Sequence, residues 1–328
     1  MRFNSGHILA IVFYSVLMVL SAIGNLTVLI VTWRRRRKAN SSRINTMLMH
    51  LAIADLLVTF ILMPIEIIWA ATVAWWAGDT VCRIASFFRT FGLYQSSFVL
   101  VCISLDRYFA VLKPMRFSDV DRRSKMMLIC AWLGSVICSF PQMLVFKVQR
   151  HPNITFYEQC ITINSFPSEA HELTYSLFGM IMMYAFPLTV IIFSYTSILT
   201  EICKKSRAPI EEHFSDSFRR SSLGFFERAR SRTLKMTIVI FLAFFICWTP
   251  YHIMAFWYWI DKKTAKGVDQ RIQRGLFLFA CTNSSINPIV YGAFNFRNKH
   301  SSQSRGRLGT NNTCTTGIRL PPLPLNPN

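Results

Sequence analysis

The sequence predicts an all-α membrane protein, a bundle of seven transmembrane helices followed by a short amphipathic helix. Composition is the first indication: 52% of the 328 residues are hydrophobic, 16% are charged, and the mean hydropathy is +0.34, values typical of a membrane protein. The second indication is the length of the apolar segments, because about 20 helical residues cross a hydrocarbon core of roughly 30 Å. Such segments lie at 8–33, 44–71, 80–112, 126–146, 173–202, 234–260 and 271–293.

Basic residues set the orientation of these segments. A run of five basic residues at 34–38 follows the first segment, and the loops after the third and fifth segments are also basic. Because Lys and Arg collect on cytoplasmic loops, we expect the N-terminus outside and the C-terminus inside. The formal charge of +20 follows this alternation, so it indicates contact with membrane lipids rather than nucleic acid. We expect a short extracellular arm at 1–7, a membrane domain at 8–300 that includes the amphipathic helix, and a disordered cytoplasmic tail at 301–328.

The topology also places two features on the outer side. Of nine cysteines, only Cys82 and Cys160 fall there, and an oxidising compartment favours a disulfide between them. Asn153 begins the only glycosylation sequon that the topology places outside. Asn153 is therefore a candidate site for a glycan.

Charged residues inside the spans are candidates for function, because a charge within a membrane is costly unless it is paired or wet. Asp55 lies near the middle of the second span, and the third span carries Arg89 and ends in Asp106 and Arg107. In the sixth span, Pro250 removes a backbone hydrogen bond and predicts a kink.

Several of these features recur in a specific order along the spans: Asn25, Leu51 to Asp55, Cys82, Asp106 to Tyr108, Trp132, Pro187, Cys247 to Pro250 and Asn287 to Tyr291. In this order they resemble a rhodopsin-like G-protein-coupled receptor. Finer motifs lie at Ser104 to Arg107, Thr233 to Thr237, Cys247 to Tyr251 and Trp257 to Trp259. These motifs are similar to those of the gonadotropin-releasing-hormone receptor superfamily.

The resemblance extends to one branch of that superfamily. Mammalian members typically exchange the Asp and Asn of the second and seventh spans and lack a tail, whereas this chain keeps Asp55 and Asn287 and has a tail. Together with His50 to Asp55 and Phe87 to Tyr94, this looks most like the insect adipokinetic hormone receptors.

The resemblance implies a plasma-membrane receptor, not an enzyme, for a secreted peptide blocked at both termini. It implies signalling through a heterotrimeric G protein by cyclic AMP, calcium or both, to mobilise energy stores. A corazonin-type or gonadotropin-releasing-hormone-type peptide is the alternative ligand, and arrestin is a further expected partner.

The resemblance also implies a ligand site in the outer half of the bundle. The acid and the base of that site correspond to Glu66 and Arg89, and its aromatic side chains to Trp75, Trp248, Tyr251, Trp257 and Tyr258. A carboxylate accepts from peptide N–H groups and an arginine donates to carbonyls, whereas aromatic rings supply flat apolar surface. For Glu66 and Arg89, a mutual ion pair that does not touch ligand remains the alternative. Vertebrate relatives carry an acid for a ligand arginine where this chain has Gln270, with Asp269 beside it, and this departure favours an uncharged peptide.

Lower in the bundle, the resemblance implies a polar network of Asn25, Asp55, Ser96, Asn283, Ser284 and Asn287. Oxygen ligands on several helices suit a sodium ion, and a water-filled hydrogen-bond network is the alternative that stays open. No other cofactor is expected.

For activation, the resemblance implies that the sixth span tilts about Pro250, with Trp248 under the ligand and Phe244 below Trp248. Arg107 would then leave Asp106 and move towards the G protein, and the other participating positions are Tyr108, Tyr195 and Tyr291. Arg230 and Arg232 occupy the region where many receptors have an acid that holds this arginine. We therefore expect some ligand-independent signalling.

A transporter or channel is the alternative from another class, since it would also bury charges such as Asp55 and Arg89. The sequence shows no internal repeats of the kind typical of transporters. A membrane enzyme would need a cluster of catalytic or metal-binding residues, and His50 and His252 are too scattered to form one.

Overall fold

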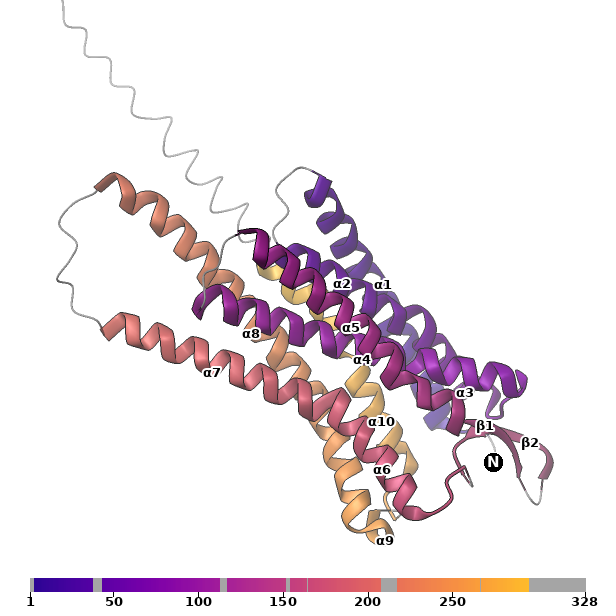
Figure 1. Cartoon of the computed structure of the whole chain (residues 1–328). Helices are drawn as coiled ribbons and strands as arrows, with labels where there is room; N and C mark the ends of the chain where they lie inside the picture. The colour runs from indigo at the N-terminus through magenta and orange to yellow at the C-terminus, as the bar shows by residue number, and fades with distance from the viewer. Residues whose placement is uncertain are drawn as a thin grey trace, which may run out of the picture.

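The computed structural model of the protein describes residues 3–37, 43–112, 117–151, 154–163, 165–207, 217–265 and 267–294. They form an elongated helical bundle with a small hairpin at one end (Figure 1). The longer helices are α1 (Ser5–Arg37), α2 (Arg43–Leu57), α3 (Met63–Thr72), α4 (Gly78–Leu112), α5 (Phe117–Val145), α6 (Glu169–Met180), α7 (Phe186–Arg207), α8 (Ser217–Ile260) and α10 (Gln270–Cys281). The shorter elements are π-helical turns η1 (Val58–Leu62) and η2 (Ile181–Ala185), strands β1 (Lys147–His151) and β2 (Ile154–Ile161), and α9 (Lys262–Ala265).

Six helical runs in the described ranges are long and apolar enough to cross a membrane: Ser5–Arg36, Arg43–Thr72, Gly78–Leu112, Asp121–Val145, Glu169–Lys204 and Thr233–Ile260. The seventh predicted span is also helical, but a turn at Thr282 divides it into α10 and a second helical piece at 283–294. Because α10 has 12 residues, or about 18 Å of helix, the two pieces cross a bilayer only together. The predicted all-α bundle is confirmed, with its last span in two parts.

Two spans contain a π-helical turn just before a proline. η1 precedes Pro64 in the first turn of α3, and η2 precedes Pro187 in the first turn of α7. A proline ring crowds the carbonyl four residues earlier, and a wider turn relieves that crowding. In contrast, α8 remains helical through Pro250, so the role of Pro250 as a swivel stays a prediction.

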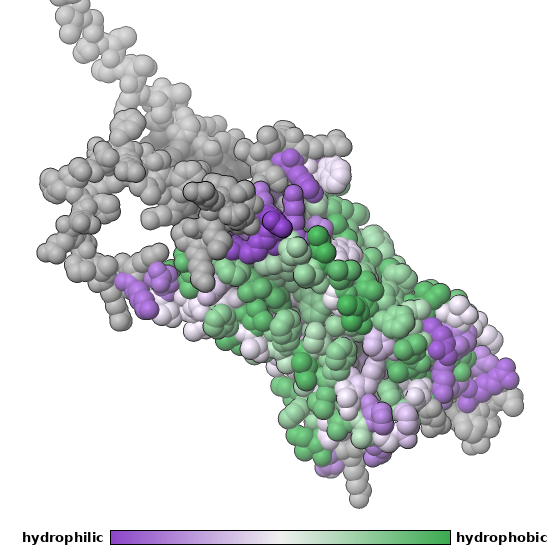
Figure 2. Space-filling model, in the orientation of Figure 1, coloured by the Kyte–Doolittle hydropathy of each residue, from purple (hydrophilic) through white to green (hydrophobic). Residues whose placement is uncertain are grey.

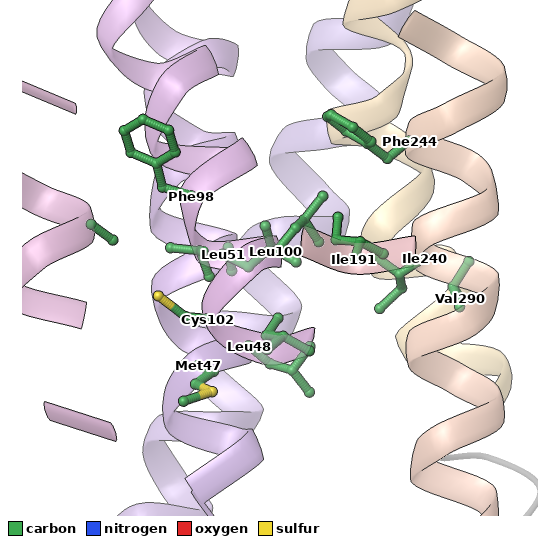
Figure 3. Packing of buried hydrophobic residues seen from close by; sticks show 14 of the residues in the cluster. Met47, Leu48, Leu51, Phe98, Leu100, Cys102, Ile191, Ile240, Phe244 and Val290 are labelled. Carbon is green, nitrogen blue, oxygen red and sulfur yellow. The ribbon is translucent and has the colours of Figure 1, made fainter. Parts of the chain in front are cut away.

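The central rod of the bundle is α4. It packs against α2, α5 and α7, and 67% of its most apolar stretch is buried, compared with 17% in α1. Figure 3 shows Leu51 of α2, Leu100 of α4, Ile191 of α7 and Ile240 of α8 gathered in one interior. The outer face seen in Figure 2 is largely hydrophobic along the bundle, as a lipid-facing surface must be.

The predicted disulfide between Cys82 and Cys160 is present, with the two Cα atoms 5.7 Å apart. It joins the outer end of α4 to β2, which pairs antiparallel with β1. The hairpin is therefore held against the end of the central helix. Asn153, the amphipathic helix expected after Phe294 and the tail at 301–328 lie outside the described residues.

Candidate functional site

A cavity of about 540 Å³ lies between α4, α5, α6, α8 and α10, within the usual size range of ligand pockets. In the described part of the chain, Arg89 is the one charged residue that lines it. Much of the remaining wall is aromatic, from Tyr94, Phe146, Tyr175, Phe178, Trp248, Tyr251, Tyr258, Trp259 and Phe277. The cavity therefore suits a ligand with flat apolar groups and hydrogen-bond acceptors for one arginine.

Arg89 forms an ion pair with Glu66. A mutual ion pair was one of the two roles that the sequence left open for these residues. The Arg89 Nη2 to Glu66 Oε1 distance is 2.7 Å, and the two side chains are 25% and 16% exposed. The pair joins α4 to α3, and the guanidinium also lies 5.0 Å from the ring centre of Phe277 and 5.8 Å from that of Trp69. Glu66 itself is not among the residues that line the cavity. Arg89 thus faces the cavity while the acid supports it from α3.

The other predicted ligand residues divide into two groups. Trp248, Tyr251 and Tyr258 line the cavity from α8. Trp257 is 44% exposed and donates its Nε1 hydrogen to Thr264. Trp75 packs beside the disulfide and donates to the Gly78 carbonyl at 2.9 Å. Neither Trp75 nor Trp257 lines the cavity, so their roles as ligand contacts stay predictions.

His252 is a cavity residue that the sequence analysis set aside as a lone histidine. It is 6% exposed, and its ring stacks at 4.4 Å on Tyr184 and at 5.7 Å on Trp248. Neither ring nitrogen has a hydrogen-bond partner among the described residues. The available signal was its spacing, because residues four apart share a helix face and His252 follows Trp248 by four. His252 therefore offers a polar contact in an aromatic part of the wall.

The predicted polar network surrounds Asp55, which is completely buried. Its carboxylate accepts hydrogen bonds from Ser96 Oγ at 3.1 Å and Asn287 Nδ2 at 2.8 Å, and the Ser284 hydroxyl also bonds to it. Asn25 Nδ2 donates to the Ser284 carbonyl at 2.9 Å, which ties α1 to the seventh span. The network thus links four spans around one buried carboxylate.

Two buried amide oxygens of the seventh span have no partner in the described part of the chain, and one of them belongs to Asn287, which bonds to Asp55. Oδ1 of Asn283 and Oδ1 of Asn287 have no hydrogen-bond partner within the described ranges, although both residues are buried. Buried polar atoms are normally satisfied. These oxygens, together with the Asp55 carboxylate, are of the type that binds a hard cation or water.

At the inner end of α4, Asp106 is also completely buried. Its Oδ2 accepts from Arg107, as predicted. Its Oδ1 accepts from Arg43 Nη1 at 3.3 Å and from Ser124 Oγ at 3.3 Å. Sequence reasoning missed Arg43, because basic residues are expected near every cytoplasmic loop and nothing in the spacing singles this one out.

The predicted activation residue Phe244 of α8 is buried among aromatic rings. Phe244 is 1% exposed and lies 6.1 Å from Tyr184 and 6.4 Å from Trp248, measured between ring centres. This places Phe244 directly below the cavity-lining Trp248, in the order that the resemblance implies.

Three of the predicted activation residues are tyrosines in the inner half of the helical bundle. Tyr195 stacks on Phe241 at 6.2 Å, Tyr108 packs on Phe193 at 5.7 Å, and the Tyr291 hydroxyl accepts from Arg35 at 3.1 Å. Contacts of Tyr195 and Tyr291 with a released Arg107 stay predictions.

Residues 24–291 match the family described as "7 transmembrane receptor (rhodopsin family)". The chain belongs to this family of G-protein-coupled receptors, which makes it a multi-pass plasma-membrane protein that acts through a heterotrimeric G protein and is not an enzyme.

Among known receptors, the chain is similar to the gonadotropin-releasing hormone II receptor of Clarias gariepinus. The two are 36% identical over 279 residues, which cover 85% of this chain and 73% of the relative. It is also 35% identical to the gonadotropin-releasing hormone receptor of Octopus vulgaris over 332 residues, 97% of this chain and 77% of the relative. The receptor of that name from Rattus norvegicus is 33% identical over 274 residues, 80% of each chain. The resemblance to this receptor group is thereby confirmed.

Proposed function

We propose that this receptor binds a short, uncharged peptide hormone of the adipokinetic type, blocked at its N- and C-termini. The N-terminus of the receptor would lie outside, and binding would raise cyclic AMP, calcium or both to mobilise energy stores. The observation that carries this proposal is the cavity wall, where the described residues include one arginine, no acid and many aromatic rings. Such a wall matches peptide carbonyls and aromatic side chains, and it offers nothing to neutralise a basic ligand group.

A gonadotropin-releasing-hormone-type peptide is the second candidate, because the similar receptors carry that name. A peptide of the corazonin type is a further member of the same ligand class. An arginine in the ligand would need an acidic partner, yet Glu66 is held by Arg89 and this chain has Gln270 at the position of the vertebrate acid. This favours the uncharged peptide.

Dose-response measurements of calcium and cyclic AMP in transfected cells test the proposal. We expect synthetic blocked peptides of the adipokinetic type to act at lower concentration than corazonin-type or gonadotropin-releasing-hormone-type peptides. The matched control is the same adipokinetic-type peptide with one arginine introduced, which should act more weakly. If a gonadotropin-releasing-hormone-type peptide is the most potent, the ligand assignment is wrong while the receptor class stands.

We propose further that a sodium ion binds beside Asp55. The support is the buried carboxylate with Ser96 and Asn287 bonded to it, together with the unsatisfied amide oxygens of Asn287 and of Asn283 on the same span. An ion there would neutralise Asp55 and stabilise the resting conformation. Replacing sodium with N-methylglucamine should raise peptide affinity in the wild type but not in Asp55→Asn. An affinity that is independent of sodium in both would favour the water-filled network.

A further inference from the structure

The two oxygens of the Asp106 carboxylate hold different partners. Oδ2 is bonded to Arg107 on the same helix. Oδ1 is bonded to Arg43 on α2 and to Ser124 on α5, each at 3.3 Å. The side chain of Asp106 is 0% exposed, whereas that of Arg43 is 28% exposed. Arg43 therefore reaches inward from the edge of the bundle to a carboxylate that water does not reach.

This division matters when the receptor changes conformation. In receptors of this family the inner end opens towards the G protein, and Arg107 is the residue expected to leave Asp106. Removing one partner from a buried ion pair strands the other charge in a poorly solvated place, which is strongly unfavourable. Arg107 can leave Oδ2, however, without disturbing the bonds on Oδ1.

Neither partner on Oδ1 belongs to the helix that is expected to move. Arg43 begins α2 and Ser124 lies on α5, and α4 packs closely against both of these helices. The expected motion is in α8, which carries Pro250. Arg43 has a second acid, Asp121, at 4.0 Å, but that carboxylate is 63% exposed and so needs no counter-charge.

We propose that Arg43 is a standing counter-charge for Asp106: it remains on Oδ1 when Arg107 leaves Oδ2, and it thereby stabilises the state that binds the G protein. Arg43 acts as a positioning residue for the family's known activity and does not contact ligand. The proposal rests on membership of the receptor family and is independent of which peptide binds.

The direction of the effect makes the proposal testable. If the ion pair between Arg43 and Asp106 stabilised only the resting conformation, removing Arg43 would raise ligand-independent signalling. If it supports the active state, its removal must lower that signalling, because Asp106 then competes to keep Arg107.

The experiment compares Arg43→Gln with Arg43→Lys in the full-length receptor. Cyclic AMP and inositol phosphate accumulation are measured without ligand and divided by the number of receptors at the cell surface. In parallel, affinity for purified, nucleotide-free Gs, Gi and Gq heterotrimers is measured on receptor in nanodiscs. We expect Arg43→Gln to weaken binding of the coupled G protein about tenfold, the usual size of a lost hydrogen bond to a charge, and Arg43→Lys to restore most of it.

Two further variants separate this role from general damage. Arg150→Gln makes the same chemical change in an exposed ion pair of the outer hairpin, where Arg150 is 76% exposed, and should leave G-protein affinity unchanged. In an Asp106→Asn background there is no charge to strand, so Arg43→Gln should have no additional effect. An increase in ligand-independent signalling with Arg43→Gln, an unchanged G-protein affinity, or an equal loss in the Asp106→Asn background would overturn the proposal.

Discussion

The central helix carries an acid–arginine pair at each end, and the two pairs are built differently. Arg89 and Arg107 are 18 residues apart, about 27 Å along α4. The outer pair joins α4 to α3 through Glu66. The inner pair joins Arg107 to its own neighbour in the chain, Asp106. Breaking the outer pair therefore removes one link between two helices, whereas breaking the inner pair frees one side chain.

The difference explains how one rigid helix can serve both ends of a signal path. The outer arginine is fixed by Glu66 and by the rings of Trp69 and Phe277, so it presents a stationary donor to the cavity. The inner arginine is bonded to Asp106, whose other oxygen already accepts hydrogen bonds from Arg43 and Ser124. A fixed group suits recognition and a releasable group suits switching.

The largest expected effect follows from breaking the outer pair. Arg89→Gln leaves Glu66 without its counter-charge and removes the donor from the cavity wall, and removal of one partner of a buried pair costs about 3–5 kcal/mol. We expect fewer receptors at the cell surface and no calcium response to the adipokinetic-type peptide.

The charge exchange sharpens this result. Glu66→Arg combined with Arg89→Glu restores the ion pair but places an acid on the cavity wall. We expect it to recover surface expression, measured by an N-terminal epitope, without recovering peptide binding. Full recovery of both would mean that the outer pair is purely structural.

Breaking the inner pair should have a smaller effect of opposite sign. Asp106→Asn removes the charge that holds Arg107, and a hydrogen bond to a charged group contributes about 1.5–3 kcal/mol. We expect surface expression close to wild type and ligand-independent cyclic AMP or inositol phosphate raised about tenfold or more. If Asp106→Asn left ligand-independent signalling unchanged, Arg107 would be held mainly by a group other than Asp106.

A third prediction concerns His252, which lines the cavity and has two ring nitrogens without a partner among the described residues. His252→Phe keeps the stacking on Tyr184 and Trp248 but removes both polar atoms. If the peptide bonds to this histidine, its potency should fall about fivefold, the equivalent of roughly 1 kcal/mol. The control is His252→Gln, which should retain part of the potency because the amide can also donate and accept. Equal potency of wild type and His252→Phe would exclude the contact.

The sequence predicted most of the fold for clear physical reasons, whereas the members of the polar network were named from the resemblance. Apolar length determines which segments can cross the membrane, and the orientation expected from the basic loops stays a prediction. A buried Asp55 must find polar partners, and the partners found are those that the resemblance indicated. Neither proline nor glycine lies within four residues of the turn at Thr282 that divides the seventh span, so the sequence does not predict this turn.

The sequence did not predict which side chains contact one another between helices. Whether Glu66 meets Arg89, and which side of that pair faces the cavity, depends on how α3 and α4 are rotated about their axes, which hydropathy does not fix. Arg43 illustrates the same limit, because its charge already had a sufficient explanation as a cytoplasmic loop residue. Trp75 was expected at the ligand site only because of the resemblance to the receptor family, and the structure places it beside the disulfide.

The smallest expected effect tests whether the rings around the outer pair matter beyond their bulk. Phe277→Leu keeps an apolar side chain next to Arg89 but removes the aromatic face 5.0 Å from its guanidinium. A cation–π contact contributes about 0.5–1 kcal/mol at exposed sites and about 2 kcal/mol when desolvated. Because Arg89 is 25% exposed, we expect the lower contribution and a fall in peptide potency of about two- to fivefold, with ligand-independent signalling unchanged because the inner pair is untouched. The matched control is Phe277→Tyr, which retains the ring and should behave as wild type. If Phe277→Leu raised ligand-independent signalling, the outer pair would itself be part of the switch, and the separation between a fixed outer end and a releasable inner end of α4 would be wrong.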